Sequence, residues 1–319
     1  MIPSKQHILV IRLGALGDLV LCFRAFHEIR LAHPNAEIAL LVRPAFADFA
    51  RAMPWFDRVL IDTHPTFAQP AAWLRLRKEI KTFAPDRVYD LQGKRRQTIL
   101  YALLGGPCGV EWSGAAPLCK FPRPWPPANG MSFQDFLAAQ LRAAGAAESS
   151  PPDLTWLDAP VENFALPERY AVLIAGCSSG APHKRWPPEK YAEAAKRLQK
   201  KDLACVAIGT KADADALAAI QAQAPFVIDL SNQTNLFELA GILRRATGVI
   251  GNDTGPLHMA AAVGTPTLAL FSASSDPVWS KPPGEKVAVM QSPILADLSA
   301  DKVVAAFETL LQHPEHESR

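Results

Sequence analysis

The stretch HILVIRLGALGDLVLCFRAFHEIRLAHPNAEIALLV, residues 7–42, decides the fold class. Its first residues, 7–12, are rich in β-branched and leucine side chains, as in a buried strand. Residues 18–32 carry apolar side chains at helical spacing, and residues 37–42 return to a strand pattern. A strand, a helix and a second strand in this order predict two parallel strands joined by a right-handed crossover.

The same alternation continues through the first half of the chain. We expect further strands at residues 58–61 and 87–90, and helices at residues 70–83 and 132–144. Proline, glycine and tryptophan crowd residues 107–129, which predicts a loop there. Four prolines fall within residues 146–167, so we interpret this stretch as the linker between two domains.

A second series of strands and helices follows the linker. Its expected strands are 170–175, 204–209, 226–229, 248–251 and 267–271, and its expected helices are 188–200, 212–223, 236–246, 255–263 and 301–312. The alternation predicts an α/β protein with two Rossmann-like, doubly wound parallel sheets, in domains 1–155 and 156–319. The last helix, 301–312, is a candidate to pack back toward the N-terminal domain. Ligands of such sheets bind at the carboxyl ends of strands, so two facing sheets would enclose a cleft.

Composition excludes several classes of protein. The chain has 319 residues, of which 49% are hydrophobic and 20% charged, and this excludes a disordered chain. Its longest apolar runs fall far short of the ~20 residues that cross a bilayer. Arg12 interrupts the first apolar run, so we expect no signal peptide. The five cysteines form no CxxC pair and are odd in number, which favours a reduced, cytoplasmic compartment.

Positive charge gathers in the first half. Residues 1–160 hold 18 Lys+Arg and 14 Asp+Glu, a net +4, whereas residues 161–319 hold 15 and 17, a net −2. The contrast is sharpest at residues 75–96, which carry eight Lys+Arg against three Asp+Glu. This pattern is typical of a site for an anionic partner, and equally of a solvated basic face.

A short glycine-containing loop, GALGD at residues 14–18, joins the first strand to the first helix. Such a loop can approach an anion closely, but it is neither GxGxxG nor a Walker A sequence. Dinucleotide binding, and with it a dehydrogenase, is therefore weakly supported. Asp18 at the helix start is either a cap for backbone donors or a catalytic base, and spacing alone leaves both open.

Two loops of the second half could bind phosphate. GNDTGPLH, residues 251–258, joins a strand to a helix, and the N–H groups of such a turn favour an anion. Asp253 could also be a helix cap and His258 a core residue. CSSGAPHKRWP, residues 177–187, combines small hydroxyl residues with a Lys-Arg pair and suits a diphosphate, or is an ordinary basic loop.

Metal-binding patterns are weak. Asp213-Ala214-Asp215 matches the DxD pattern by which some glycosyltransferases hold a divalent cation, but it begins a helix, where capping and exposure explain it better. The histidines His64, His183 and His258 lack metal-ligand spacing. We therefore expect no metal site.

Four motifs together resemble glycosyltransferase family 9, the heptosyltransferases that build the inner core of lipopolysaccharide. They are IRLGALGD (residues 11–18), DLQGKRR (90–96), DLSNQTNL (229–236) and GNDTGPLHMAAA (251–262), the last followed by a Gly-Thr-Pro tripeptide at 264–266. The resemblance spans most of the chain. It implies a GT-B fold, an ADP-heptose donor on the second domain and an acidic, Kdo-bearing lipid A acceptor on the first.

The resemblance also implies site residues. Asp18 would be the base of an inverting, metal-independent transfer, and Lys184 would stabilise the leaving diphosphate. The implied donor-binding residues are Ser178, Ser179, Lys184, Asp213, Leu230, Ser231, Asp253, Thr254, Gly255 and His258, with the match between Asp213 and Asp215 open. The implied acceptor-binding residues are Gly14, Gly17, Gln92, Lys94, Arg95 and Arg96.

The resemblance further implies a peripheral protein at the cytoplasmic face of the inner membrane, with no cofactor and no nucleic-acid partner. Two alternatives remain open. One is transfer of another nucleotide-activated sugar to a different envelope glycan. The other is a non-catalytic protein that binds a nucleotide sugar.

Overall fold

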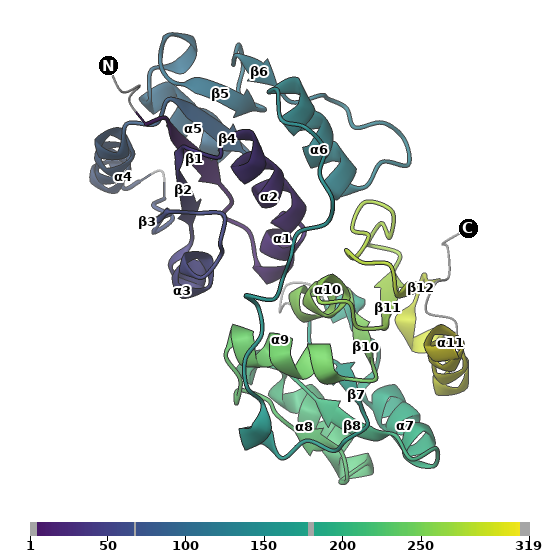
Figure 1. Cartoon of the computed structure of the whole chain (residues 1–319). Coiled ribbons are helices and arrows are strands. Elements are labelled where there is room, and N and C mark those ends of the chain that lie inside the picture. Colours follow the sequence, from purple (N-terminus) through teal and green to yellow (C-terminus); the bar gives the residue numbers. More distant parts are fainter. Residues whose placement is uncertain (1–4, 67, 178–181, 313–319) are drawn as a thin grey trace. The chain divides into compact units, whose positions relative to one another are not determined.

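Each half of the chain forms a six-stranded, all-parallel sheet with helices on both faces (Figure 1). The computed structural model describes residues 5–66, 68–177 and 182–312. It divides into two units, Met1–Trp156 and Leu157–Arg319. Each unit is described below by itself.

The first sheet has the strand order β3-β2-β1-β4-β5-β6. Its strands are β1 (His7–Ile11), β2 (Glu37–Val42), β3 (Arg58–Ile61), β4 (Arg87–Asp90), β5 (Glu111–Gly114) and β6 (Phe121–Pro122). The predictions for the first four strands are confirmed, because apolar and β-branched runs between turn residues are a strong strand pattern. The loop expected at residues 107–129 is wrong in part, since it contains β5 and β6. Both strands are short, and they end in Gly114 and Pro122, residue types that are typical of turns.

Helices cover both faces of this first sheet. They are α1 (Leu16–Val20), α2 (Phe23–Ala32), α3 (Ala47–Arg51), α4 (Pro70–Phe83), α5 (Arg95–Leu103) and α6 (Phe133–Ala143). The α4 and α5 side chains share a core with one face of the sheet, and α2 and α6 contact each other on the opposite face. The single helix expected at residues 18–32 is two helices. The chain tightens at Cys22, whose N–H donates to the Leu19 carbonyl three residues back, at 3.0 Å.

The second sheet has the order β12-β11-β10-β7-β8-β9. Its strands are β7 (Tyr170–Ile174), β8 (Ala204–Ala207), β9 (Ile228–Asp229), β10 (Gly248–Asn252), β11 (Thr267–Ser272) and β12 (Val287–Ser292). We did not predict β12. It lies at an edge of the sheet, and only Ser292 of its six residues is buried, although its first four residues, Val-Ala-Val-Met, are an apolar run.

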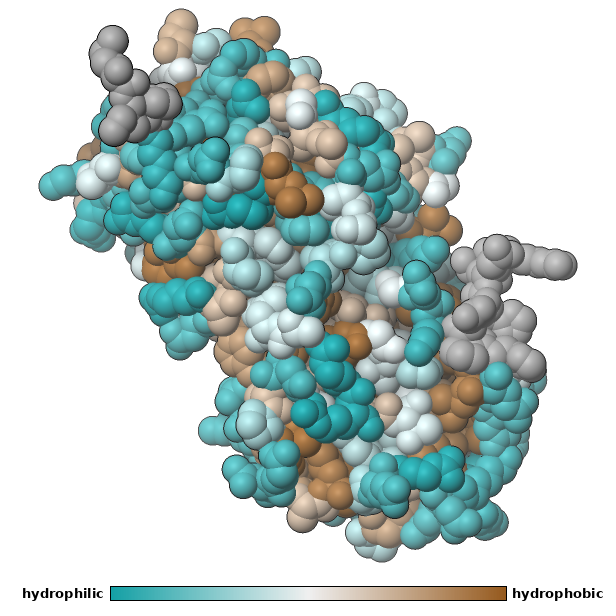
Figure 2. Space-filling model, in the orientation of Figure 1, coloured by the Kyte–Doolittle hydropathy of each residue, from teal (hydrophilic) through white to brown (hydrophobic). Residues whose placement is uncertain are grey.

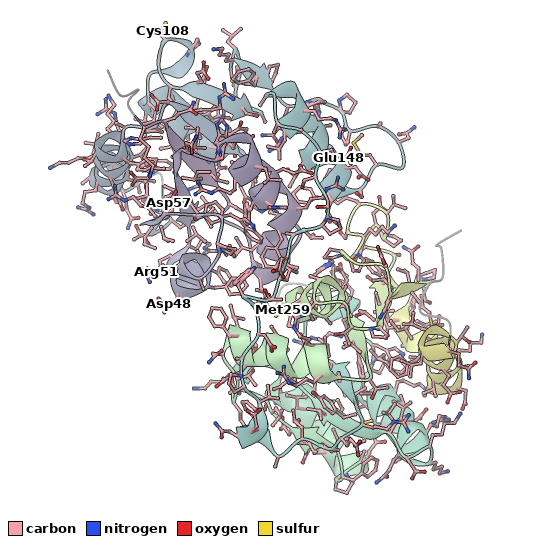
Figure 3. The ribbon with its side chains drawn as sticks, viewed as in Figure 1. Asp48, Arg51, Asp57, Cys108, Glu148 and Met259 are labelled. Carbon is pink, nitrogen blue, oxygen red and sulfur yellow. The ribbon has the colours of Figure 1, made fainter. Side chains whose placement is uncertain are left out.

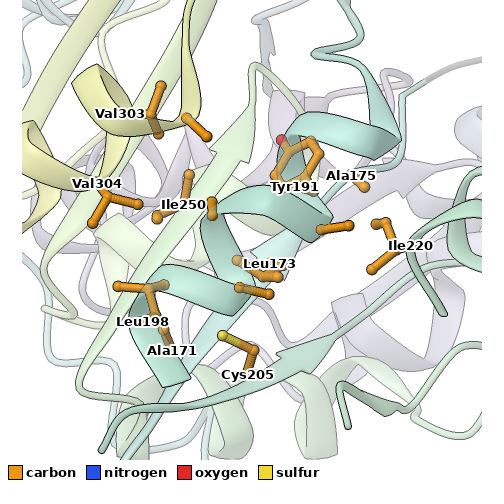
Figure 4. Packing of buried hydrophobic residues seen from close by; sticks show 14 of the residues in the cluster. Ala171, Leu173, Ala175, Tyr191, Leu198, Cys205, Ile220, Ile250, Val303 and Val304 are labelled. Atoms are coloured by element: carbon orange, nitrogen blue, oxygen red, sulfur yellow. The ribbon is translucent and has the colours of Figure 1, made fainter. Parts of the chain in front are cut away.

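The helices of the second unit are α7 (Pro188–Gln199), α8 (Ala214–Gln223), α9 (Leu236–Arg245), α10 (Gly255–Ala262) and α11 (Ala300–Gln312). Side chains of α7, α8 and α11 form one core with the sheet, as Figure 4 shows for Leu173, Tyr191, Ile250 and Val303. The closing helix α11 buries Val303, Val304, Phe307 and Leu310 in this core. Its apolar face is thus occupied within its own unit.

Short 3₁₀ turns complete the two units. They span Pro44–Phe46, Gly106–Cys108, Glu162–Phe164, Pro182–Lys184, Lys211–Asp213 and Leu295–Asp297. The described helices include none with the length and apolar character of a membrane span. The surface in Figure 2 is mostly hydrophilic, with small scattered apolar patches.

The expected linker is ordered at both ends. Glu148, labelled in Figure 3, accepts a hydrogen bond from Arg24 of α2 at 2.5 Å. The Trp156 and Phe23 rings pack edge to face, with their centroids 5.8 Å apart. On the other side of the division, Leu157 is fully buried and Asp158 pairs with Arg245 at 2.6 Å. The change from one unit to the next is therefore confined to a few residues of the proline-rich stretch.

The strand order fixes where ligands can bind. In each sheet the chain winds outward in one direction and then reverses, at β1 and β4 in the first sheet and at β7 and β10 in the second. Neighbouring loops diverge at such a reversal and leave a crevice at the carboxyl ends of the strands. Four of the stretches singled out from the sequence, residues 14–18, 90–96, 177–187 and 251–258, lie at the carboxyl ends of these four strands.

Candidate active site

Asp18 of the first unit lies beside the reversal between β1 and β4. Its Oδ1 accepts a hydrogen bond from Nη2 of Arg12 at 2.6 Å, and its Oδ2 accepts one from the Ala15 N–H at 2.9 Å. The second contact caps the start of α1, as one of the two interpretations predicted. The Asp18 side chain is nevertheless 43% exposed, and each oxygen takes only one of these two hydrogen bonds, so the carboxylate keeps acceptor capacity. Capping and catalysis are therefore compatible in this geometry.

Gly14 makes room for this carboxylate. A Cβ atom at Gly14 would lie 2.1 Å from Oδ2 of Asp18 and 2.3 Å from its Cβ, closer than atoms can approach. The loops after β1 and β4 are also tied together, because Gln92 Oε1 accepts the Leu13 N–H at 3.0 Å. The glycine and the glutamine thus fix the backbone that carries Asp18.

A pocket of about 580 Å³ opens at this edge of the first sheet. It is lined by Leu13, Gly14, Ala15, Asp18, Arg43, His64, Pro65, Thr66, Gln92, Lys94, Arg96 and Gln97. These residues follow β1, β2, β3 and β4, whose carboxyl ends meet here. Sequence reasoning missed Arg43, His64 and Thr66, although each follows a predicted strand and could have been found from that position.

The charges in the pocket are unevenly compensated. Arg96 pairs with the buried Asp62 at 2.6 Å and donates to the Pro65 carbonyl at 2.7 Å, so its charge serves the fold. Asp18 is paired with Arg12. Arg43 and Lys94 are exposed and line the pocket. With both carboxylates already paired, these two cations leave the pocket positively charged.

His64 lines the same pocket and is exposed. Partial desolvation, and then the nearby Arg96 guanidinium, lower the pKa of His64 below its ordinary value. The imidazole is therefore neutral at pH 7. Of the six predicted acceptor-binding residues, four line the pocket: Gly14, Gln92, Lys94 and Arg96. The other two, Gly17 and Arg95, do not line it.

The second unit brings two of its expected donor loops together. Lys184 Nζ lies 2.8 Å from Oδ2 of Asp253, so the loop after β7 meets the turn after β10. Thr254, the N-cap residue of α10, makes no side-chain capping hydrogen bond. By contrast, Asn235 caps α9 through two backbone N–H groups. In the described part of the chain, the start of α10 thus receives no cap from the Thr254 side chain, and the residue before Thr254, Asp253, contacts Lys184.

Asp253 collects three partners. Besides Lys184, it accepts from Ser275 Oγ at 2.8 Å and lies 3.1 Å from Nε2 of the buried His258. Burial alone would raise the pKa of Asp253, but the hydrogen bonds and charges of His258 and Lys184 outweigh it and hold this pKa well below its usual range. Asp253 is thus an ionised anchor rather than a helix cap, and Ser275 is a member that the sequence did not indicate.

Asn252, the last residue of β10, holds the same turn through buried hydrogen bonds. It is fully buried, accepts the Trp186 N–H at 2.9 Å and donates to the Ala175 carbonyl at 3.0 Å. These bonds join the end of β10 to both ends of the loop that carries Lys184. The backbone on both sides of Lys184 is therefore held by Asn252, in addition to the contact of the Lys184 side chain with Asp253.

Asp213 holds two loops of the second unit together. Its carboxylate is buried and accepts hydrogen bonds from the Cys177 N–H, from Arg185, and from the N–H and hydroxyl of Thr210. Asp213 thereby anchors the loops after β7 and β8. That an acidic side chain here binds ribose stays a prediction. Asp215 is exposed on α8.

The remaining donor predictions are placed as follows. Ser178 and Ser179 lie outside the described residues. Leu230 is buried and its N–H donates to the Ala207 carbonyl at 2.9 Å. The Ser231 N–H donates to Asp229 at 2.8 Å, which holds the backbone after β9.

The described part of the chain holds no group of three or more His, Cys, Asp or Glu side chains that could bind a metal ion. None of the five cysteines forms a disulfide, and Cys108 is exposed at the surface (Figure 3).

Comparison with known proteins agrees with this geometry. The family model described as Glycosyltransferase family 9 (heptosyltransferase) matches residues 73–304. The chain belongs to glycosyltransferase family 9. This confirms the resemblance found in the motifs.

Alignments with individual curated relatives cover only part of the chain. Lipooligosaccharide heptosyltransferase 2 of Haemophilus influenzae is 32% identical over 126 residues, which is 37% of this chain and 36% of that protein. The alignment thus spans little more than a third of that relative's length.

Solved family 9 structures match over nearly the whole chain. The family 9 glycosyltransferase of Veillonella parvula has a TM-score of 0.82 and 20% identity, covering 98% of this chain and 99% of its own. The Escherichia coli heptosyltransferase WaaC with ADP has a TM-score of 0.76 and 19% identity, covering 96% and 100%. These likenesses show the GT-B fold that the sequence predicted.

Proposed function

We propose that this family 9 glycosyltransferase transfers a heptose, with inversion, from ADP-heptose to an acidic acceptor of the lipopolysaccharide inner core. The observation that carries the proposal is the N-terminus of α10, which has no side-chain cap and lies beside the Lys184–Asp253 pair. The known relatives support the same donor and acceptor class, because one is solved with ADP and another is named a lipooligosaccharide heptosyltransferase.

The second unit would hold the donor diphosphate. The N–H groups at the start of a helix and the helix dipole both favour a negative charge. The Lys184 ammonium carries three protons, one of which faces Asp253, and its side chain is 26% exposed. Two protons therefore remain for phosphate oxygens. Charge that builds up on the departing ADP would be stabilised by this cation and by the backbone N–H groups of Thr254 and Gly255.

The first unit would hold the acceptor. Its pocket carries an excess of positive charge from Arg43 and Lys94, which suits the carboxylates of an acidic glycolipid. Such an acceptor is presented at a membrane surface, so we expect peripheral association with the cytoplasmic face of the inner membrane.

The chemistry follows from Asp18. The acceptor hydroxyl oxygen attacks the anomeric carbon of the heptose on the face opposite ADP, and the carbon–oxygen bond to the diphosphate breaks. The hydroxyl proton passes to an oxygen of Asp18, and ADP leaves with the bonding electron pair. Inversion results because attack and departure occur on opposite faces. No step requires a metal ion, so EDTA should leave the rate unchanged.

The test is a transfer assay with purified protein, ADP-heptose and a Kdo-bearing lipid A acceptor, followed by mass spectrometry of the product. A mass increase of one heptose, with release of ADP, is expected. Thermal shift against a panel of nucleotide sugars identifies other donors, because a ligand at 100 times its Kd adds about 2.7 kcal/mol of stability. Donor binding without turnover on any acceptor would instead favour a non-catalytic binding protein.

A further inference from the structure

Arg12 is a buried cation with an exposed anion as its partner. Its side chain is 4% exposed, whereas the Asp18 side chain is 43% exposed. In the other ion pair at this pocket, Arg96–Asp62, the carboxylate is the buried member, at 1% exposure. In the Arg96–Asp62 pair the carboxylate thus faces the interior of the protein. The Arg12 pair is reversed, because it holds a carboxylate outward from the protein.

The guanidinium of Arg12 is fixed on three sides. Nη1 donates to the Leu91 carbonyl at 2.6 Å, and Nε donates to the Asp18 carbonyl at 3.2 Å. Nη2 donates to Oδ1 of the Asp18 side chain at 2.6 Å. The Phe133 ring lies against the guanidinium, 4.8 Å from its Cζ atom. The planar fork of arginine suits this set of acceptors, and a lysine ammonium could not span it.

We propose that Arg12 is a positioning residue for transfer: it holds the Asp18 carboxylate in the one orientation in which it takes the acceptor proton. This inference rests on the proposed function. Arg12 donates a hydrogen bond to Oδ1 of Asp18, and the Ala15 N–H donates one to Oδ2. These two bonds set the plane of the carboxylate before substrate binds. Preorganised geometry of this kind matters strongly, since a misplacement of about 1 Å can cost ~10²-fold in rate.

The chain offers a matched control in Arg123. This arginine is partly buried, with its Cζ 5.2 Å from the Phe136 ring centroid. It donates to the Asp90 carbonyl, one residue before Leu91, at 2.5 Å and to Gln140 at 2.5 Å. Among the described residues, these side-chain hydrogen bonds of Arg123 go to Asp90 and Gln140 and not to Asp18. Arg123 therefore shares the packing role of Arg12 without the contact to the carboxylate.

The experiment compares heptose transfer by the full chain and by the variants Arg12→Gln, Asp18→Asn, the double variant, and Arg123→Gln. For Arg12→Gln we expect kcat to fall by about 10- to 100-fold, with KM for donor and acceptor within twofold of wild type. The double variant should be no slower than Asp18→Asn, because Arg12 acts through Asp18. Arg123→Gln should keep kcat within about threefold.

Three results would overturn the proposal: an unchanged kcat for Arg12→Gln, losses that multiply in the double variant, or an equal loss for Arg123→Gln. If Arg12→Gln does not fold, Arg12→Lys is measured in the same way. Lysine keeps the charge but loses the fork, so a several-fold fall in kcat is expected, and full activity contradicts the proposal. Wild-type protein that transfers no heptose refutes the proposed function instead, which separates the two failures.

Discussion

The ammonium of Lys184 lies 2.8 Å from the Asp253 carboxylate, although the two residues are 69 positions apart in the chain. The contact crosses the reversal between β7 and β10, where the sheet leaves a crevice. It joins the two loops of the second unit that the sequence indicated as phosphate sites. A cation is thereby held beside the start of α10, which is the arrangement that a diphosphate requires.

The first prediction concerns the cation itself. Lys184→Ala should weaken ADP binding about 10- to 100-fold, because a hydrogen bond to a charged group contributes about 1.5–3 kcal/mol. Isothermal titration calorimetry with ADP measures this directly. Lys190→Ala, at a partly exposed lysine of α7 that pairs with Glu193, serves as the control and should leave the affinity unchanged. Equal affinities for wild type and Lys184→Ala would place Lys184 outside the donor site.

The second prediction is a pH dependence of stability. The folded pKa of Asp253 lies well below its ordinary value of 3.8, so its contribution to stability is present above pH 3.8 and is lost as pH falls toward the folded pKa. Urea unfolding of wild type should therefore show a free energy that drops from pH 5 to pH 3. Asp253→Asn should be less stable at pH 5 and show a smaller drop over this range. Parallel pH profiles for the two proteins would contradict the role of Asp253 as an ionised anchor.

The third prediction separates the two pocket cations Arg43 and Lys94 from the other cations of the basic segment 75–96. Arg43→Gln and Lys94→Gln should each raise the acceptor KM by up to about fivefold, because an exposed ion pair contributes about 0.2–1 kcal/mol. The acceptor KM should also rise with salt more than the donor KM. Lys78→Gln is the control, since Lys78 is exposed on α4 and lines a different surface groove. A change for Lys78→Gln as large as for Lys94→Gln would indicate diffuse attraction rather than a defined pocket.

The sequence was sufficient for the fold because strong patterns recur in it. The strands β1 to β4 and helix α4 follow from apolar periodicity between turn residues. It was insufficient for β6 and β12, which are short or lie at a sheet edge. Site loops could be predicted because they follow strands, but their contacts could not. The bonds of Asp213 to Cys177 and Arg185, and the burial of Arg12, depend on segments that meet only in the folded chain.

The fourth prediction tests the space around Asp18. Gly14→Ala would place a methyl group 2.1 Å from the present position of Oδ2, so the carboxylate must move. We expect kcat to fall at least tenfold while ADP affinity stays unchanged, because in the proposed function the donor binds to the other unit. Steady-state kinetics and calorimetry on the same preparation measure both. Full activity of Gly14→Ala would show that the carboxylate need not occupy this position.

The central claim is that Asp18 takes the acceptor proton, and Asp18→Asn tests it. The structure adds one expectation: asparagine has a single side-chain acceptor for the two donors Arg12 and Ala15, so the variant should lose about 1 kcal/mol of stability, as for a lost cap. This loss leaves a folded protein. Thermal unfolding and ADP calorimetry confirm that the variant is folded and still binds donor.

The decisive measurement is the single-turnover rate of heptose transfer at saturating ADP-heptose and acceptor, for wild type and for Asp18→Asn. Our account predicts a rate ~10²–10⁴-fold lower for the variant, the usual contribution of a positioned general base. A folded, donor-binding Asp18→Asn protein that keeps more than about a tenth of the wild-type rate would contradict it.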